Sequence, residues 1–460
     1  MIQIGHLFAI GKNPRKTFLQ WHHELGPIFG LKLGVKPWIM IGRADIAYEI
    51  LHKERNNTSG KPFYRLLSEF YSCEEKGIVF SQPTPSWRQA RAAVLSVLSP
   101  KKLENELGDV LEREADELID ILMAGQEDID PTNHLLRASL NFILITCLNK
   151  RTSSIDDPLF TTLIDLLQSC IAHSDIVKYH IGAFLPVLSM LNRWTGTEQA
   201  FADLLKNKRN PFYMQLIQEA LESDTDCLAK VLMIREKLDV EYVIATLNDM
   251  VIAGSDTTTV TLGWAFSILC TMPDVQEKIQ QEIDAFTSKH KRLPTFCERN
   301  QVPYLIAVQK ECLRFRPTTP CGAPHLVDQD MEWRGNIIPK GTTVVANMIA
   351  IHSNPDSFPE PKIFRPERFL DHLEPMSILA TKKIGERDHF NFGWGRRVCP
   401  GIALAEIQLF NVFTRVFSQC TIMPPASGEK IDLDAYFSGS VGAIAAPPRT
   451  PLRFVARSIK

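Results

Sequence analysis

The longest uninterrupted helical pattern in the chain runs over residues 240–272, and it limits the fold more than any other feature. The stretch contains no proline and is apolar along most of its length. A membrane span needs about 20 apolar residues. Asp249 and Asp256 argue against a span, because a charge near the bilayer centre costs about 2.5–3.5 kcal/mol. The pattern therefore predicts a long helix buried inside a protein, lined on one side by polar groups that mark a site.

The flanking sequence predicts a mainly helical protein with a proline-rich C-terminal part. Residues 28–33 and 38–41 predict two short strands around a glycine turn, and helix-like stretches follow from Trp87 onward. Prolines gather after Thr318, and dense proline favours rigid coil with little helix. No linker, repeat or low-complexity tract divides the sequence, so residues 1–460 are predicted to form a single domain.

Charge and cysteine usage narrow the class of protein. Lys and Arg number 51 against 53 Asp and Glu, which gives a formal charge of −2 with no basic block. We therefore expect no nucleic-acid partner. The ten cysteines are scattered through apolar stretches without a CxxC pair, which is typical of a reducing compartment.

One cysteine lies in a loop of unusual composition. Residues 392–401 read FGWGRRVCPG and are followed by an apolar helical pattern. Gly393 and Gly395 permit the positive φ angles of a tight bulge. Arg397 can keep a thiolate ionised or pair with an anion alongside it. Cys399 comes just before a helix N-terminus, where negative charge is favoured. A lone cysteine is usually inert packing, but these residues in register indicate a loop that cradles a thiolate.

This loop resembles the haem-binding signature of the cytochrome P-450 family, Phe-x-x-Gly-x-Arg-x-Cys-x-Gly, at Phe392, Gly395, Arg397, Cys399 and Gly401. The resemblance implies the cytochrome P-450 fold, mainly α with small β-sheets, a long central helix over the haem and a proline-rich meander before the cysteine loop. It also implies haem b (iron protoporphyrin IX) with Cys399 as the axial iron ligand. Arg397, Phe392, Gly393 and Gly401 are then expected to bind the cofactor.

A second motif lies in the long helical stretch. Taken alone, Gly254 and the threonines after it would be an irregularity in a core helix without a functional role. Placed before the cysteine loop, the segment 253–258 resembles the oxygen-activation motif of the family. The resemblance implies that Thr257 hydrogen-bonds dioxygen and that Asp256 relays protons from solvent.

Two further motifs follow the order of the family. Glu311 and Arg314 lie three residues apart, so they share one helix face and can pair. With Arg368 they match a buried three-member network that fixes the meander. Three other positions match residues that bind haem propionates in the family: Trp87, Arg91 and His325.

The resemblance implies a haem-thiolate monooxygenase that activates O₂ to hydroxylate or otherwise oxidise a small hydrophobic metabolite. The chain has no Gly-x-Gly-x-x-Gly turn, so its electrons are expected to come from NADPH through a separate diflavin reductase. Oxidative coupling or desaturation without oxygen insertion remains an alternative, as does a non-catalytic haem-binding sensor, although mere binding needs no proton relay. The expected substrate pocket contains Val251, Gly254, Ser255, Thr319, Cys321 and Val441.

The resemblance extends to eukaryotic microsomal members and, in sequence style, to fungal enzymes of secondary metabolism. Membrane-bound members begin with a spanning helix and a proline-rich hinge. This sequence starts just after them, so we expect the anchor to be absent from the chain. Residues 184–191 resemble the apolar patch by which anchored members touch the bilayer, and an ordinary buried helix end explains them equally well. We expect a monomer, located on the cytosolic face of the endoplasmic reticulum in an anchored full-length form and in peripheral contact with the membrane.

Overall fold

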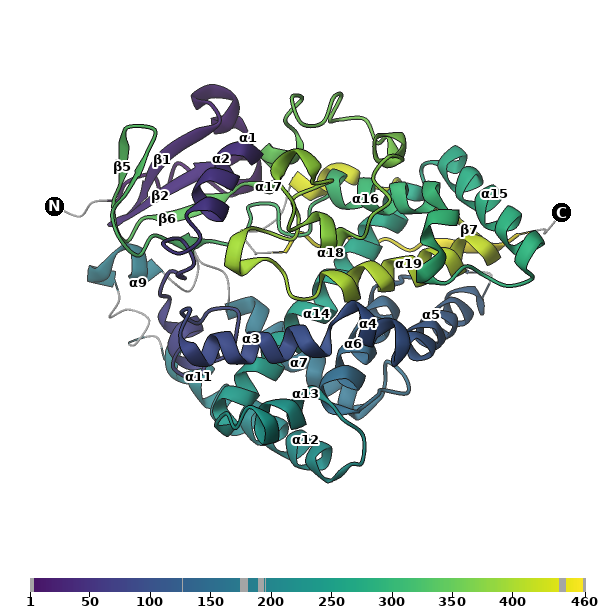
Figure 1. Ribbon diagram of the computed structural model, residues 1–460, viewed down its shortest axis with the longest axis horizontal. Helices are drawn as coiled ribbons and strands as arrows, with labels where there is room; N and C mark the ends of the chain where they lie inside the picture. Colours follow the sequence, from purple (N-terminus) through teal and green to yellow (C-terminus); the bar gives the residue numbers. More distant parts are fainter. Residues whose placement is uncertain are drawn as a thin grey trace.

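The computed structural model describes residues 4–125, 127–173, 181–188, 194, 196–437 and 444–457. It is mainly helical with small sheets, so the predicted fold class is confirmed (Figure 1). The α-helices are α1 (Pro14–Leu25), α2 (Ala44–Ala47), α3 (Pro85–Val97), α4 (Pro100–Asn105), α5 (Gly108–Met123), α6 (Thr132–Leu148), α7 (Pro158–His173), α9 (Ile181–Phe184), α11 (Thr197–Leu204), α12 (Asn210–Glu222), α13 (Leu228–Lys230), α14 (Val240–Leu269), α15 (Pro273–His290), α16 (Pro303–Phe315), α17 (Met348–His352), α18 (Met376–Leu379) and α19 (Ile402–Gln419).

The strands form three small sheets. They are β1 (Ile28–Leu33), β2 (Lys36–Ile41), β3 (His325–Leu326), β4 (Met331–Trp333), β5 (Asn336–Ile338), β6 (Thr343–Ala346), β7 (Cys420–Met423) and β8 (Arg453–Ala456). The largest sheet has the order β1-β2-β6-β3, in which β2 pairs with β6 in parallel. Both strands expected near the N-terminus are present. Their sheet joins the start of the chain to the proline-rich part more than 280 residues later.

Helix α14 is the long buried helix predicted from the sequence, and it ends three residues earlier than expected, at Leu269. Asp239 caps its N-terminus by accepting a hydrogen bond from the backbone N–H of Tyr242. Its buried hydroxyls donate to carbonyls four residues earlier, as Thr246 does to Tyr242 and Thr259 to Ser255. These bonds let a helix rich in Ser and Thr cross an apolar interior.

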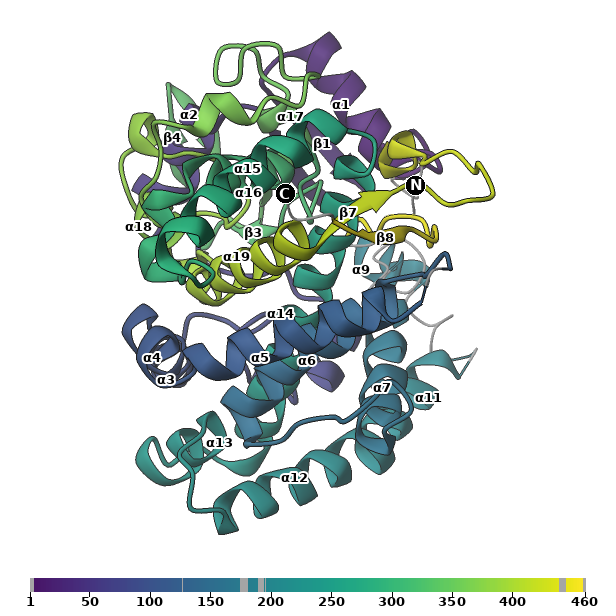
Figure 2. The same cartoon turned by 90° about the vertical axis from the view of Figure 1, so that its right-hand side faces the viewer.

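Helix α14 lies in the middle of the molecule. It packs against α6 and α12 on one side and against α16 and α19 on the other. Figure 2 shows this arrangement, with α15, α16 and α19 above α14 and with α5, α6 and α12 below it. The cysteine loop precedes α19, so the packing of α19 against α14 brings the loop close to the centre of the long helix.

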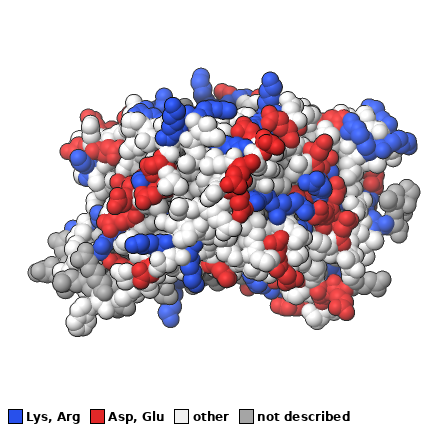
Figure 3. Space-filling view, turned by 90° about the horizontal axis from the view of Figure 1, so that it is seen from below, with Lys and Arg blue, Asp and Glu red and all other residues white. Residues whose placement is uncertain are grey.

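Charge distribution on one face of the molecule and the apolar character of the helices bear on possible partners. On the face drawn in Figure 3, Lys and Arg are interspersed with Asp and Glu. None of the described helices combines the length and the apolar character that a bilayer crossing requires. Within the apolar segment 184–191, Phe184 and Leu185 are buried while Val187 is 70% exposed. Residues 189–191 lie outside the described residues.

Candidate active site

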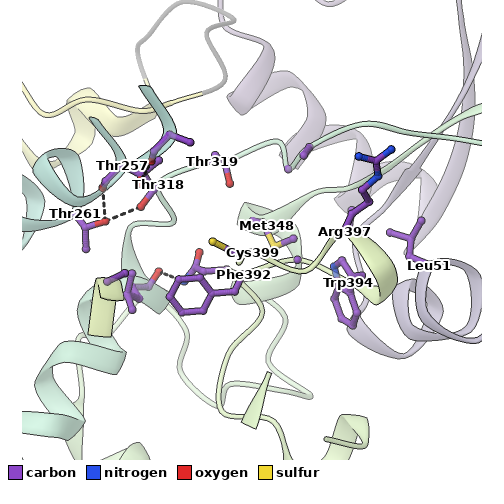
Figure 4. Close-up of a pocket in the computed structure, with 18 of the residues that line it drawn as sticks. Leu51, Thr257, Thr261, Thr318, Thr319, Met348, Phe392, Trp394, Arg397 and Cys399 are labelled. Carbon is purple, nitrogen blue, oxygen red and sulfur yellow. Dashed lines mark hydrogen bonds between the residues drawn. The ribbon is translucent and has the colours of Figure 1, made fainter. Parts of the chain in front are cut away.

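Two cavities of about 310 and 240 Å³ meet at Cys399. They share walls from the middle of α14, including Ala253 and Thr257, and from the loop that carries Arg397 and Cys399. Figure 4 shows the sulfur of Cys399 facing the space between Thr257 of α14 and the loop. The long helix and the cysteine loop therefore form opposite walls of one site.

The loop around Cys399 has the backbone geometry that its glycines predict. Gly393 and Gly395 have φ angles of 80° and 57°. A Cβ atom on Gly395 would lie 2.3 Å from the carbonyl oxygen of Leu51, so this position has no room for a side chain. The backbone N–H of Cys399 donates to the Phe392 carbonyl at 2.8 Å, which closes the loop on itself.

The surroundings of Cys399 act on the pKa of its thiol in opposite directions. Burial raises its pKa, while the backbone N–H of Gly401, 3.4 Å from Sγ, and the charge of Arg91 both lower it. Arg91 also donates to the carbonyl of Val398, next to the cysteine. Arg397 acts elsewhere, because its guanidinium donates to the carbonyls of residues 59, 78 and 81. The cation that favours the thiolate is therefore Arg91. The other role predicted for Arg397, pairing with an anion alongside the thiolate, stays a prediction.

Three cations border the cavity without a carboxylate partner among the described residues: Lys61, which is buried, and Arg91 and Arg397, which are half-buried. Lys61, Arg91 and Arg397 form no ion pair with any carboxylate of the described residues, and Asp328 acts on Arg397 only at longer range. Burial and repulsion from Arg397 and Arg91 lower the pKa of Lys61 to about 7. Unpaired buried charges are costly. The two propionates of a haem would supply the missing negative charge, so this donor set fits the expected cofactor.

Lys61 was missed in the sequence. Its only local signal is its place between Gly60 and Pro62. Its ammonium group donates to the carbonyl of Pro324 at 2.9 Å, which brings it beside His325.

The other residues expected near the propionates also lie at this end of the cavity. His325 is buried, with Nδ1 2.8 Å from the Thr58 carbonyl, so Nδ1 carries the proton. Burial holds the pKa of His325 near 3, and the neutral ring offers an acceptor at Nε2. The indole N–H of Trp87 donates to the Ile78 carbonyl at 3.0 Å, and its ring lies under the Arg397 guanidinium. Trp87 thus positions Arg397 in this structure.

Asp256 and Thr257 lie at the centre of α14, opposite Cys399. Thr257 lines both cavities, and its hydroxyl donates to the Ala253 carbonyl at 2.6 Å. Asp256 does not line them, and burial raises its pKa to about 6. The carboxyl group is therefore in a range where it exchanges protons near neutral pH.

The network predicted around Glu311 is present. Its carboxylate receives two hydrogen bonds of 2.7 Å from Arg314, and the Nε of Arg368 lies 3.1 Å from it. Glu311 is fully buried. The backbone N–H of Arg365 also donates to Glu311 at 2.8 Å, which ties the proline-rich segment to α16.

Only some of the residues predicted to form the substrate pocket line the cavities. Gly254 and Thr319 line the cavities. Val251, Ser255 and Cys321 do not, because Ser255 turns its hydroxyl back to the Val251 carbonyl and Cys321 packs against an apolar cluster elsewhere. We leave these three out of the proposed pocket. Val441 lies outside the described residues. Walls that the sequence did not indicate include Leu313, Ala346 and Met348.

The chain is similar to known proteins in sequence and in structure. The family model "Cytochrome P450" matches residues 1–446. The chain is similar to cytochrome P450 monooxygenase 69 of Postia placenta, with 27% identity over 99% of this chain and 88% of that protein. It is also similar to cytochrome P450 2E1 of Mesocricetus auratus, with 28% identity over 99% of this chain and 92% of that protein. A solved structure of a zebra fish cytochrome P450 with progesterone is 26% identical, has a TM-score of 0.80, and aligns over 96% of this chain and 99% of its own.

Proposed function

Because the chain belongs to the cytochrome P450 family, we propose that Cys399 ligates a haem iron and that the cavity above it holds a small hydrophobic substrate for oxidation. At the level of the family, the protein is a haem-thiolate monooxygenase. The observation that carries the assignment of the site is that the half-buried thiol of Cys399 lies at one cavity with three cations that have no carboxylate partner among the described residues.

The residues of this chain have distinct tasks in the proposed reaction. When bound, the haem supplies the reductive activation of O₂, in which one oxygen atom enters the substrate and the other becomes water. Lys61, Arg91 and Arg397 would bind the propionates and so hold the cofactor in the site. Gly401 and Arg91 favour the ionised sulfur through an N–H group and a positive charge.

The middle of α14 provides the proton path. We assign to Asp256 the task of taking up a proton from solvent, since its pKa of about 6 allows it to hold one near neutral pH. Thr257 lines the cavity. It can pass a proton on while it keeps its place through the Ala253 carbonyl.

The apolar walls support a hydrophobic substrate. Leu313, Ala346, Met348 and Leu409 line the larger cavity, and Thr318 and Thr319 supply a few hydroxyls. The zebra fish relative was solved with progesterone, which is also a small apolar molecule. We therefore propose that the substrate is an apolar metabolite about as small as progesterone.

Electron supply and location complete the proposal. We propose that a separate NADPH-dependent diflavin reductase supplies the electrons and that the monomeric protein works at the endoplasmic reticulum. Its similarity to P450 2E1 supports this. Purified protein should then oxidise its substrate only when the reductase is added to NADPH. Turnover with NADPH alone would contradict this part.

The test of the iron ligand is the absorption spectrum of the reduced carbon-monoxide complex. The unmodified protein should give the red-shifted Soret band of a thiolate-ligated haem, and Cys399→Ala should lose it. Cys297→Ala, which changes an exposed thiol, is the matched control and should keep it. A red-shifted band in Cys399→Ala would disprove the assignment.

Isotope-labelled O₂ then separates oxygen insertion from oxidative coupling or desaturation. Mass analysis should find one labelled atom in the product. Product without label would favour the alternative chemistry at the same site.

A further inference from the structure

A third cavity, of about 540 Å³, is bordered by the proline-rich segment and lies apart from the two cavities at Cys399. Its walls come from the start of α2, from residues 354–372 and from residues 384–390 just before the cysteine loop (Figure 1). Phe390 lines this cavity and stacks on Trp394 at 5.2 Å, and Trp394 lines the haem cavity. The two cavities are therefore separated by one aromatic stack.

Arg387 is the buried cation of this cavity. Its side chain is only 7% exposed, its Nε has no hydrogen-bond partner, and Nη2 donates to the Gly393 carbonyl at 3.1 Å. The guanidinium lies 4.5 Å from the centre of the Trp394 ring. No carboxylate of the described residues pairs with it, and burial lowers its pKa to about 10.

Asp388 attracts Arg387, but none of the neighbouring acids among the described residues forms an ion pair with it. Asp388, the next residue, pairs with Lys310 at 2.9 Å. Arg43 and Asp45 pair with each other.

The network around Glu311 also carries an excess of positive charge near this cavity. Arg314 and Arg368 share the single carboxylate of Glu311, which leaves one positive charge over, and Arg368 lines the cavity. Asp356, the remaining acid on the wall, is exposed. The cavity is thus bordered by the buried Arg387, which has no carboxylate partner among the described residues, and by a group of two arginines that share one carboxylate. This arrangement is costly unless an anion is bound.

We propose that this cavity binds a small oxyanion such as inorganic phosphate, with the Arg387 guanidinium as its main ligand. A guanidinium presents a planar fork that suits two oxygens of such an anion. Arg387 also holds the carbonyl of Gly393, in the loop that ends at Cys399. A bound anion would fix Arg387 and, through it, this end of the loop.

The test uses the haem-containing protein at constant ionic strength, with chloride replaced stepwise by phosphate. Calorimetry should show saturable binding of one phosphate per chain, and the melting temperature should rise with phosphate. Sulfate should compete, and acetate should bind more weakly because it offers fewer oxygens.

Arg387→Gln should weaken phosphate binding at least tenfold. Arg365→Gln is the matched control, because it removes an arginine of the same segment that already pairs with Glu360 at the surface. It should bind phosphate as the unmodified protein does. Absence of saturable binding, or unchanged binding in Arg387→Gln, would overturn the proposal.

A second variant covers the case in which Arg387→Gln fails to fold. Ser357 is an exposed residue on the cavity wall. Ser357→Glu adds a carboxylate there and leaves the contacts of Arg387 to Gly393 and Trp394 unchanged. It should raise the melting temperature in phosphate-free buffer and lower phosphate affinity at least tenfold. If Ser357→Glu folds and still binds phosphate with full affinity, the cavity is not an anion site.

Discussion

At the scale of single residues, the site depends on side chains whose charge the interior has shifted. An ordinary aspartate is almost wholly ionised at pH 7, because its pKa is near 3.8. Burial moves the pKa of Asp256 to about 6, so a tenth of the molecules hold the proton at pH 7. This residue is next to Thr257, which lines the cavity. A proton reservoir next to the cavity is what the proposed reaction requires.

We predict that Asp256→Asn lowers the fraction of NADPH electrons that appear in product, by roughly tenfold or more. In the unmodified protein, coupling should fall as the pH rises from 6 to 8, because the protonated form of Asp256 becomes scarcer. The variant should lose this dependence on pH. The measurement is product formed per NADPH consumed, and Asp274→Asn, on the exposed side of α15, is the control. An unchanged ratio in Asp256→Asn would exclude it from proton supply.

At the scale of elements, the meander is held to α16 by Glu311. Arg314, Arg368 and the N–H of Arg365 all bind its carboxylate. We predict that Glu311→Gln lowers the free energy of unfolding by about 3–5 kcal/mol, because two arginines lose their shared counter-charge. Denaturant unfolding measures this loss.

The matched control is Glu360→Gln, which breaks the surface pair with Arg365. It should cost less than about 1 kcal/mol. Equal costs for the two variants would show that the buried network contributes no more than a surface pair.

A second element-scale feature is the segment between α2 and α3 that closes over the cavity. Cys73, Glu74 and Glu75 have consecutive positive φ angles of 45°, 63° and 62°, which non-glycine residues adopt at a cost. Asp249 of α14 holds the end of this segment by accepting the N–H groups of Ile78 and Val79 at 2.7 and 3.0 Å.

We predict that Asp249→Asn loosens this segment, because an amide oxygen accepts two N–H groups less strongly than a carboxylate does. Hydrogen exchange of peptides covering residues 71–80 should quicken about tenfold, while peptides from β1 and β2 should keep their rates. Unchanged exchange over 71–80 would show that other contacts hold the segment.

At the scale of the whole molecule, cofactor binding and stability are coupled through Lys61. In haem-free protein, the pKa of Lys61 is about 7, against an ordinary value of 10.5 that the unfolded chain retains. Between pH 7 and 10.5 the unfolded state binds the extra proton, so the stability of the fold rises with pH in that window. The slope is at most about 1.4 kcal/mol per pH unit. Haem propionates would restore the charge on Lys61 and remove this slope.

We therefore predict that removing the haem lowers the stability and introduces this slope. Urea unfolding at pH 7.5 and pH 9 should show the difference in haem-free protein and not in the haem-bound form. Lys61→Gln should abolish it, while Lys53→Gln, at an exposed position, should leave it. The same slope in haem-free Lys61→Gln would contradict the role of this lysine.

The sequence alone determined the features that depend on neighbours in the chain. The spacing of Glu311 and Arg314, the glycines before Cys399 and the unbroken pattern of α14 each act over a few residues, where backbone geometry fixes which groups meet. Only the tertiary structure decided which distant segments converge. It brought Lys61 to Arg397, turned Ser255 and Cys321 away from the cavity and left Arg387 without a carboxylate partner among the described residues. These contacts between distant residues depend on how α14, α19 and the meander pack against one another. No local pattern in the chain encodes the direction in which a side chain points after this packing.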